Sequence, residues 1–168
     1  MLKRLAILVE NSPGVLTHIA SMISGRAYNI ETIAASSTEK QDITRISLVV
    51  EVEDEWQLNQ IVAQLEKMVQ VFRVLDMNDQ NSMGRELGLI KIRADAATRS
   101  EIIDVVNVFG ARIIDFNTRS MLIEITAEGN KIDAFCQVMA DYGIIEIIRT
   151  GEICLDTSAE AASSAIFK

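Results

Sequence analysis

The sequence predicts an α+β protein made of two ferredoxin-like βαββαβ domains, each an antiparallel sheet with two helices on one face. Three observations lead to this prediction. The chain has 168 residues, of which 49% are hydrophobic, enough for one ordinary domain or two small ones. Apolar patterns of strand and helix type follow one another in the order β-α-β-β-α-β, and the same order recurs in the second half. A polar stretch at 78–84 carries no apolar pattern and is predicted to be the linker between them.

The first domain is predicted to cover 1–77 and to open on a strand at 2–10. A helix is expected from 13 to 25, with Ser12 as its N-cap and Pro13 as its first residue. Gly14 would keep the start of this helix bare. The apolar stripe at helical spacing consists of Val15, Leu16, Ile19, Met22 and Ile23.

The remainder of the first domain supplies two more strands around a second helix. A strand starts near Asn29, and the next strand, at 43–52, alternates cleanly between apolar and polar residues. Asp54 is predicted to cap the second helix, with Gln57 three residues later completing a capping box. A fourth strand at 69–75 closes the domain. Such a unit leaves one sheet face and its edge strands open, so we expect it to pair with a second copy.

The second domain is predicted to cover 85–155 and to repeat this rhythm. Its expected elements are a strand at 87–92, a helix at 95–109 closed by Gly110, strands at 111–116 and 121–127, a helix at 131–142 and a strand at 144–148. Residues 153–155 are expected to extend this last strand. The Ser/Ala-rich segment 156–168 is predicted to be a flexible tail.

Composition argues against several classes of partner. The formal net charge of −8 disfavours binding to nucleic acid, which needs a basic face. No apolar run approaches the roughly 20 residues that span a bilayer, so no membrane partner is expected. Met1 leads almost directly into the first strand without a signal or transit peptide, which is typical of a cytoplasmic protein. Cys136 and Cys154 lack metal-ligand spacing and are interpreted as core thiols of a reducing compartment.

Catalysis is not supported by the residue pattern. The single histidine, His18, is expected on a solvated helix face, and no nucleophile, base or metal set gathers around it. No glycine-rich stretch matches a phosphate-cradling loop. We therefore predict no catalytic residue and no metal site.

The corner between the first strand and the first helix is a candidate binding site. Bare backbone N–H groups near Gly14 would suit a small anion, and Asn11 adds an amide donor and a carbonyl acceptor. This chemistry fits a free amino acid. The alternative is that Pro13 and Gly14 merely shape a turn, and the spacing alone leaves both interpretations open.

Two sequence blocks also carry a family resemblance. ENSPGVL at 10–16, followed by AYNIETI at 27–33, resembles the opening of an ACT domain, in particular that of acetolactate synthase regulatory subunits. RELGLIKIRA and GARIIDF extend the resemblance through the second half, to about residue 155. One departure is Ala27, where the family usually has glycine.

The resemblance implies a non-catalytic regulatory subunit that binds the catalytic large subunit of acetolactate synthase, raises its activity and transmits feedback inhibition by valine. The catalytic partner, not this chain, would hold thiamine diphosphate, magnesium and FAD. The effector, a branched-chain amino acid, would sit between the ACT domains of a homodimer. The residues that match this effector-binding role are Asn11, Gly14, Val15, Leu16, Asn29 and Ile30.

Two alternatives compete with this interpretation. A free-standing ACT-domain amino-acid sensor could act on a transcription or transport system, but the second domain lacks a basic groove-reading helix and fits subunit docking better. A small ferredoxin-like hydrolase is disfavoured because no catalytic constellation is present.

Overall fold

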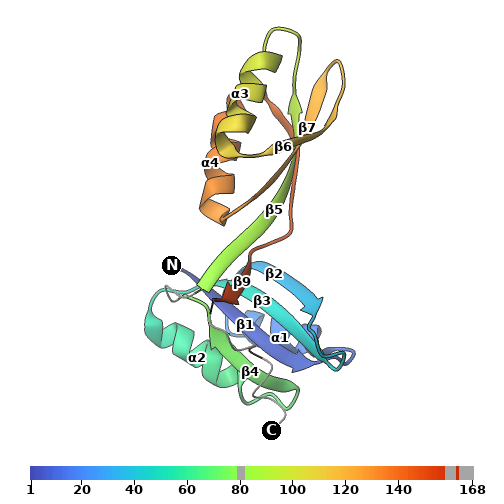
Figure 1. Cartoon of the computed structure of the whole chain (residues 1–168). Coiled ribbons are helices and arrows are strands. Elements are labelled where there is room, and N and C mark those ends of the chain that lie inside the picture. The colour runs from blue at the N-terminus through green and yellow to red at the C-terminus, as the bar shows by residue number, and fades with distance from the viewer. Residues whose placement is uncertain (79–81, 158–161, 163–168) are drawn as a thin grey trace. The chain divides into compact units, whose positions relative to one another are not determined.

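The structure, a computed structural model, describes residues 1–78, 82–157 and 162 and divides the chain into two compact units (Figure 1). The first unit comprises Met1–Met83 together with Glu152–Lys168, and the second comprises Gly84–Gly151. The C-terminal segment thus belongs with the N-terminal half, so the second unit is inserted into the first along the chain.

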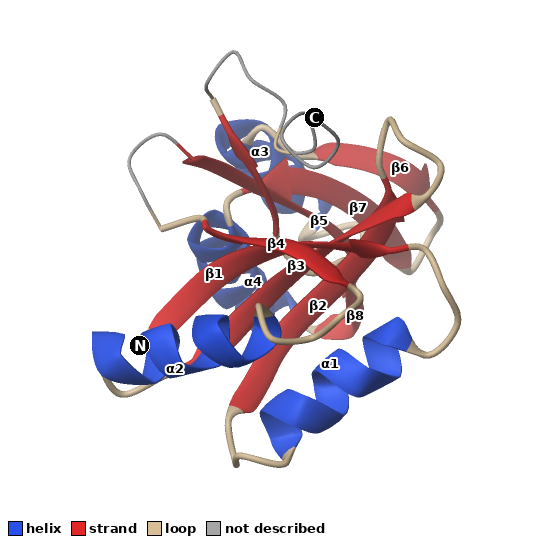
Figure 2. Cartoon of the chain, turned by 90° about the horizontal axis from the view of Figure 1, so that it is seen from below, coloured by secondary structure: helices blue, strands red, loops and turns tan. Residues whose placement is uncertain are grey.

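The first unit has the predicted order of elements. They are β1 (Leu2–Glu10), α1 (Val15–Ser24), β2 (Asn29–Ser37), β3 (Ile43–Glu51), α2 (Glu55–Leu65) and β4 (Val71–Asp76). The sheet order is β2-β3-β1-β4, with every neighbouring pair antiparallel. Both helices lie on one face of this sheet (Figure 2), so the predicted ferredoxin-like architecture is confirmed.

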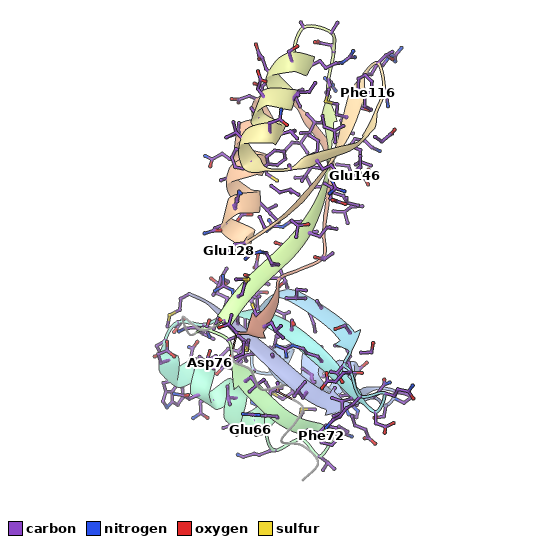
Figure 3. The ribbon with its side chains drawn as sticks, viewed as in Figure 1. Glu66, Phe72, Asp76, Phe116, Glu128 and Glu146 are labelled. Carbon is purple, nitrogen blue, oxygen red and sulfur yellow. The ribbon has the colours of Figure 1, made fainter. Side chains whose placement is uncertain are left out.

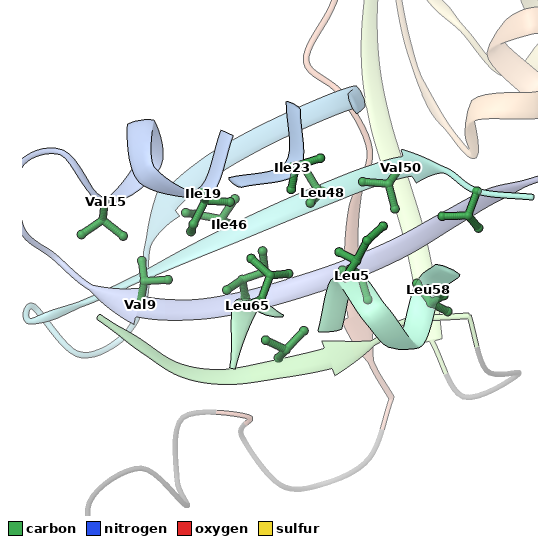
Figure 4. Close-up of a cluster of buried hydrophobic side chains, with 14 residues drawn as sticks. Leu5, Val9, Val15, Ile19, Ile23, Ile46, Leu48, Val50, Leu58 and Leu65 are labelled. Atoms are coloured by element: carbon green, nitrogen blue, oxygen red, sulfur yellow. The ribbon is translucent and has the colours of Figure 1, made fainter. Parts of the chain in front are cut away.

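The core of the first unit lies between its two helices and its sheet (Figure 4). Helix α1 buries Val15, Ile19 and Ile23, which are spaced four residues apart. Leu16 is 45% exposed, so its predicted place in the apolar stripe is wrong. Adjacent helical residues point about 100° apart, and with Val15 facing the sheet, Leu16 turns towards the surface.

The opposite face of this sheet is partly covered by the C-terminal strand β9 (Ile153–Asp156). The buried Cys154 packs there against Ala6, Leu75 and Met77. Arg45 Nη2 donates to the backbone carbonyl of Cys154 at 2.6 Å. Residues 153–155 form this separate strand and are not a direct continuation of the strand that ends at Arg149, because residues 150–152 interrupt the two.

The second unit repeats the same topology. Its elements are β5 (Ser82–Arg93), α3 (Arg99–Phe109), β6 (Arg112–Phe116), β7 (Ser120–Ala127), α4 (Gly129–Met139), the 3₁₀ turn η1 (Ala140–Tyr142) and β8 (Ile144–Arg149). The order along the sheet is β6-β7-β5-β8, and β9 pairs with β5 outside this path. Phe135 is fully buried, with its ring edge-on to Phe109 at a centroid distance of 5.3 Å.

Two elements in this region start four or five residues away from the position that the sequence predicts. Strand β5 begins at Ser82, within the predicted linker at 78–84, and its pairing with β9 explains strand structure where the sequence has no apolar pattern. Residues 79–81 of that predicted linker lie outside the described residues. Helix α3 begins at Arg99 rather than at 95, because the Asp95 carboxylate accepts the backbone N–H groups of Ala97 and Thr98 in a turn.

A buried ion pair stabilises the second unit where the chain enters and leaves it. Glu86, 3% exposed, accepts from Arg149 Nη2 at 2.5 Å and from the backbone N–H of Gly151 at 3.1 Å. Arg149 Nη1 also donates to Asp133 on α4 at 2.5 Å. These bonds raise the pKa of Arg149, so the guanidinium stays charged.

Candidate functional site

The corner between β1 and α1 is a tight turn at Pro13–Gly14. Gly14 has φ +87° and ψ −12°, the values of the third residue of a type II turn. Proline is favoured just before that position. Helix α1 therefore begins at Val15, and the predicted start at Pro13 with Ser12 as N-cap is wrong. The Ser12 hydroxyl donates to the Glu10 carboxylate at 3.3 Å, so it does not cap the helix.

This turn leaves the start of α1 open. Among the described residues, no side chain caps the helix, and a Cβ added at Gly14 would meet no other atom within 4 Å. The first N–H groups of a helix have no partner within the helix and attract anions. The corner thus has the backbone donors and the free approach that a carboxylate requires.

Asn11 is fixed at the edge of this corner by two hydrogen bonds. Its backbone N–H donates to the carbonyl of Asp42 at 2.9 Å, and its side-chain Nδ2 donates to the carbonyl of Gln41 at 3.1 Å. These bonds orient the amide so that Oδ1 is the end available to accept a hydrogen bond. The ammonium group of a free amino acid is a hydrogen-bond donor that could bind to this oxygen.

The six predicted effector residues fall into two separate groups. Asn11, Gly14, Val15 and Leu16 gather at the corner, whereas Asn29 and Ile30 open β2 at the other end of the sheet. Glu10 pairs with Ile43 at one end of β3, and Asn29 pairs with Glu51 at the other end. That length of strand corresponds to about 25 Å. One copy of the chain therefore cannot bring Asn11 and Asn29 onto the same small ligand.

Asn29 borders a shallow cleft of about 370 Å³ in the first unit. The cleft is lined by Met1, Arg26, Ala27, Tyr28, Asn29, Glu51, Val52, Glu53 and Gln57. Only Asn29 among these was predicted as a site residue. The other residues have no distinctive spacing in the sequence, since the register between β2 and β3 is what brings Glu51 beside Asn29.

The segment that leads into Asn29 closes the C-terminal end of α1 with two backbone hydrogen bonds. The N–H of Tyr28 donates to the carbonyl of Ile23 at 3.4 Å, and the N–H of Ala27 donates to that of Ser24 at 3.0 Å. These two bonds form a Schellman motif, whose next-to-last residue adopts left-handed backbone angles. That residue is Ala27, with φ +60°. The departure from glycine noted in the sequence thus falls at a position where glycine is favoured.

The other candidate groups are dispersed. His18 lies exposed on α1. Burial raises the pKa of the Cys154 thiol and also that of Cys136. Within the described part of the chain, no group of three or more His, Cys, Asp or Glu side chains is placed to hold a metal ion. In the same part, no helix has the length and apolarity needed to cross a membrane.

Comparisons with known proteins connect both units to one family. A family model described as an AHAS small subunit-like ACT domain matches residues 5–73, and one described as the small subunit of acetolactate synthase matches residues 85–158. The acetolactate synthase small subunit of Mycolicibacterium smegmatis is 41% identical over 161 residues, 96% of this chain and 94% of that protein. The small subunit of Bacillus subtilis is 38% identical over 151 residues, 90% of this chain and 88% of that protein.

A solved structure agrees with these sequence comparisons. The crystal structure of the acetolactate synthase small subunit from Thermotoga maritima superposes with a TM-score of 0.83 and 32% identity, covering 93% of this chain and 97% of that one. The fold and the sequence thus point to the same relatives over nearly the whole chain. This chain belongs to the family of acetolactate synthase small subunits, in which it is a regulatory subunit, without catalysis of its own, to a catalytic large subunit.

Proposed function

We propose that this chain activates the catalytic subunit of acetolactate synthase and transmits feedback inhibition by valine, bound between the first units of two copies. The observation that carries this proposal is the division of the candidate residues between two ends of one sheet. A corner with donors for a carboxylate stands at one end, and an asparagine beside a cleft stands at the other.

Pairing of two copies would reunite the two ends. Strand β2 is an edge of the first sheet, so its outer backbone groups can pair with another strand. When two copies of β2 pair in antiparallel fashion about a twofold axis, the Asn29 end of one strand lies beside the Ser37 end of the other. Ser37 pairs with Thr44, next to the corner that holds Asn11. The joint sheet would therefore carry two equivalent effector sites.

Each group of valine has a complementary partner in this arrangement. The open N–H groups that follow Gly14 suit the carboxylate. The side-chain oxygens of Asn11 and the partner's Asn29 suit the ammonium. Leu16, which is 45% exposed, offers an apolar surface to the isopropyl group, whereas Val15 is buried and supports the corner from below. Ile30, partly buried, would add apolar surface from the partner.

The regulatory effect follows if valine binds one arrangement of the paired units more tightly than another. A ligand shifts such an equilibrium by its differential affinity for the two states. The valine-bound arrangement would activate the catalytic subunit less. The chemistry would remain in that partner, with thiamine diphosphate, magnesium and FAD.

A mixing experiment tests whether the site is shared between copies. Asn11→Ala and Asn29→Ala should each weaken valine binding about 10- to 150-fold, because each removes a partner of a charged ligand group, about 1.5–3 kcal/mol. When the two variants are mixed and exchange subunits, one site of each mixed dimer keeps both asparagines. Calorimetry should then detect valine binding at about a quarter of the wild-type capacity, because half of the dimers are mixed and one of the two sites in each is intact. A mixture that binds no valine would show that both asparagines act within one chain, whereas normal binding by each single variant would show that neither acts.

A further inference from the structure

Strand β8 is an apolar edge of the second unit. It pairs with β5 on one side, and no other strand flanks it in the described sheet. Its sequence is IIEIIR, and the exposed fractions of Ile145, Ile147 and Ile148 are 52%, 41% and 59%. A strand with one solvated face normally alternates, whereas a nearly continuous apolar run is typical of a strand covered on both faces. The pattern of β8 is that of a strand with both side-chain faces covered, although its isoleucines are exposed in a single copy of the chain.

The exposed side chains of β8 point to opposite faces of the sheet. Ile147 pairs with Ile90, whose side chain is buried under the helices, so Ile147 faces the helical layer. Ile148 pairs with Leu89 and faces the opposite side of the sheet. Each face of the sheet therefore has an exposed isoleucine at the β8 edge.

The other edge of this sheet, β6, has the features that normally protect an edge. It is five residues long, and its register shifts between Ile113 and Asp115. The guanidinium of Arg99 lies 4.9 Å from the centre of the Phe116 ring. Short length, bulges and charges discourage strand addition. Figure 3 labels Phe116 on β6 and Glu146 on β8.

On β8 the register shift is confined to its start, between Ile144 and Glu146, which leaves 146–149 regular. The N–H of Thr150 donates to the carbonyl of Leu87 at 3.1 Å, so the backbone of Thr150 points towards β5. In an antiparallel ladder this direction alternates, so Ile148 also points towards β5. The backbone groups of Ile147 and Arg149 therefore point to the open side.

We propose that β8 pairs in antiparallel fashion with β8 of a second copy of this chain, about a twofold axis at Ile148, so that the two second units form one continuous sheet. In this register Ile148 meets Ile148 of the partner subunit, and Ile147 exchanges backbone hydrogen bonds with Arg149 of the partner subunit. A twofold axis perpendicular to the sheet keeps the helices of both copies on the same face of the joint sheet. Equivalent side chains of the two copies therefore point to the same face.

Charge also favours this self-pairing. With the axis at Ile148, the two Glu146 carboxylates are four residues out of register, roughly 14 Å apart. Like charges directly opposite each other would destabilise the pair. Glu146 instead lies opposite Thr150 of the partner subunit, and Lys91 of its own chain lies 3.6 Å from its carboxylate. A second copy therefore meets this edge with matching backbone, apolar surface and charge.

Disulfide trapping in the full chain tests the pairing directly. In a background in which Cys136 and Cys154 are replaced by alanine, Ile148→Cys places two thiols across the axis. Opposed residues that do not share backbone hydrogen bonds have Cα atoms about 4.5 Å apart, within the range of a disulfide. Mild oxidation should convert most of this variant to a covalent dimer on a non-reducing gel.

Two matched variants control for accessibility. Ile114→Cys tests the other edge, and Ile103→Cys reports random collisions from α3; their side chains are 43% and 37% exposed, respectively. Both should stay largely monomeric on the same gel. Trapping at residue 114 without trapping at 148, or equal trapping at all three positions, would overturn the proposal.

A second measurement is independent of thiols. Ile148→Lys should weaken the self-association measured by sedimentation at least tenfold, and an unchanged association constant would also overturn the proposal.

The proposal does not depend on the valine site, which belongs to the first unit. Valine titration of the Ile148→Cys variant in its reduced form separates the two. Loss of trapping with normal valine binding would reject only the β8 pairing, whereas normal trapping without valine binding would reject only the effector site.

Discussion

Ala27 and Gly110 are at corresponding positions in the two units, so exchanging their residue types is informative. Each residue has left-handed backbone angles, with φ of +60° and +69° respectively, at the end of the first helix of its unit. Around Gly110 the bonds are those of the same Schellman motif, since Ala111 donates to Val106 at 2.9 Å and Gly110 to Asn107 at 3.1 Å. One unit thus uses the residue that suits these angles, and the other does not.

Ala27→Gly should stabilise the first unit by about 0.5 kcal/mol, because relief of left-handed strain exceeds the added freedom of the unfolded chain. Gly110→Ala should destabilise the second unit by about 1 kcal/mol, since an added Cβ there meets no atom within 4 Å and only the backbone is strained. Urea unfolding measures both. Opposite signs are the expected result, and destabilisation by both variants would show that packing, rather than backbone angles, decides these positions.

Gly14→Asp should abolish valine inhibition while preserving activation. The side chain adds bulk and a negative charge where the ligand carboxylate is expected. It also costs about 1 kcal/mol of stability, because Gly14 has φ +87° and not ordinary helical angles. Gly14→Asn is the matched control, since it has nearly the same size and tolerates such angles without adding charge.

Rate assays of the reconstituted synthase with and without valine compare these two variants. Asparagine should retain more inhibition than aspartate if charge repulsion matters. Loss of activation along with inhibition would instead assign Gly14 to folding or docking, and normal inhibition of the aspartate variant would place the carboxylate elsewhere.

At the scale of elements, local signals in the sequence predicted most helix and strand types. The Asp54 side chain accepts from the N–H of Gln57 at 2.8 Å, as the capping box predicts. Gln57 Oε1 in turn accepts from the backbone N–H of Glu53 at 2.9 Å, one residue before the expected donor. The predicted start of α1 was wrong because a Ser-Pro-Gly sequence suits a helix cap and a turn equally. The positive φ of Gly14, which decides between them, cannot be inferred from that sequence.

Long-range pairing is what the sequence could not provide. The separation of Asn11 from Asn29 follows from the register of β3 with both of its neighbours, and no local pattern encodes that register. Likewise, the short strand β9 has the composition of a strand extension, and only its partners on β3 and β5 show where it belongs. Periodicity identifies an element but not the element that it meets.

The ion pair of Glu86 is predicted to control the stability of the second unit. Arg149→Ala should destabilise it by about 3 kcal/mol or more, because Glu86 is then left buried without its countercharge. The double variant Glu86→Gln, Arg149→Met should recover much of this loss, since it removes both charges and nearly keeps both volumes. Urea unfolding of the two variants provides the test. Equal destabilisation by both would mean that hydrogen-bond geometry, rather than the unpaired charge, dominates.

At the scale of the whole molecule, the return of β9 to the first unit changes the expectation for a chain that ends at 79. The predicted linker at 78–84 has no apolar pattern, which by itself would let a chain that ends there fold and pair. In the structure, Ala6 is 1% exposed and Met77 is 3% exposed, and both pack against Cys154. Removing residues 152–168 also removes the bond from Arg4 to Glu152 at 2.8 Å. The truncated chain therefore loses cover over one face of its sheet.

The chain 1–79 should accordingly unfold at lower urea than the first unit of the full chain and bind more of a dye specific for exposed apolar surface. It should keep part of the activating function but respond poorly to valine, because the uncovered sheet no longer holds the geometry of the paired units. Joining residues 152–157 to residue 78 through a short glycine-serine linker is the matched control and should restore the urea midpoint. Restored stability with valine sensitivity still absent would assign signalling to the second unit itself. Full sensitivity in the chain 1–79 would show that neither β9 nor the second unit is needed.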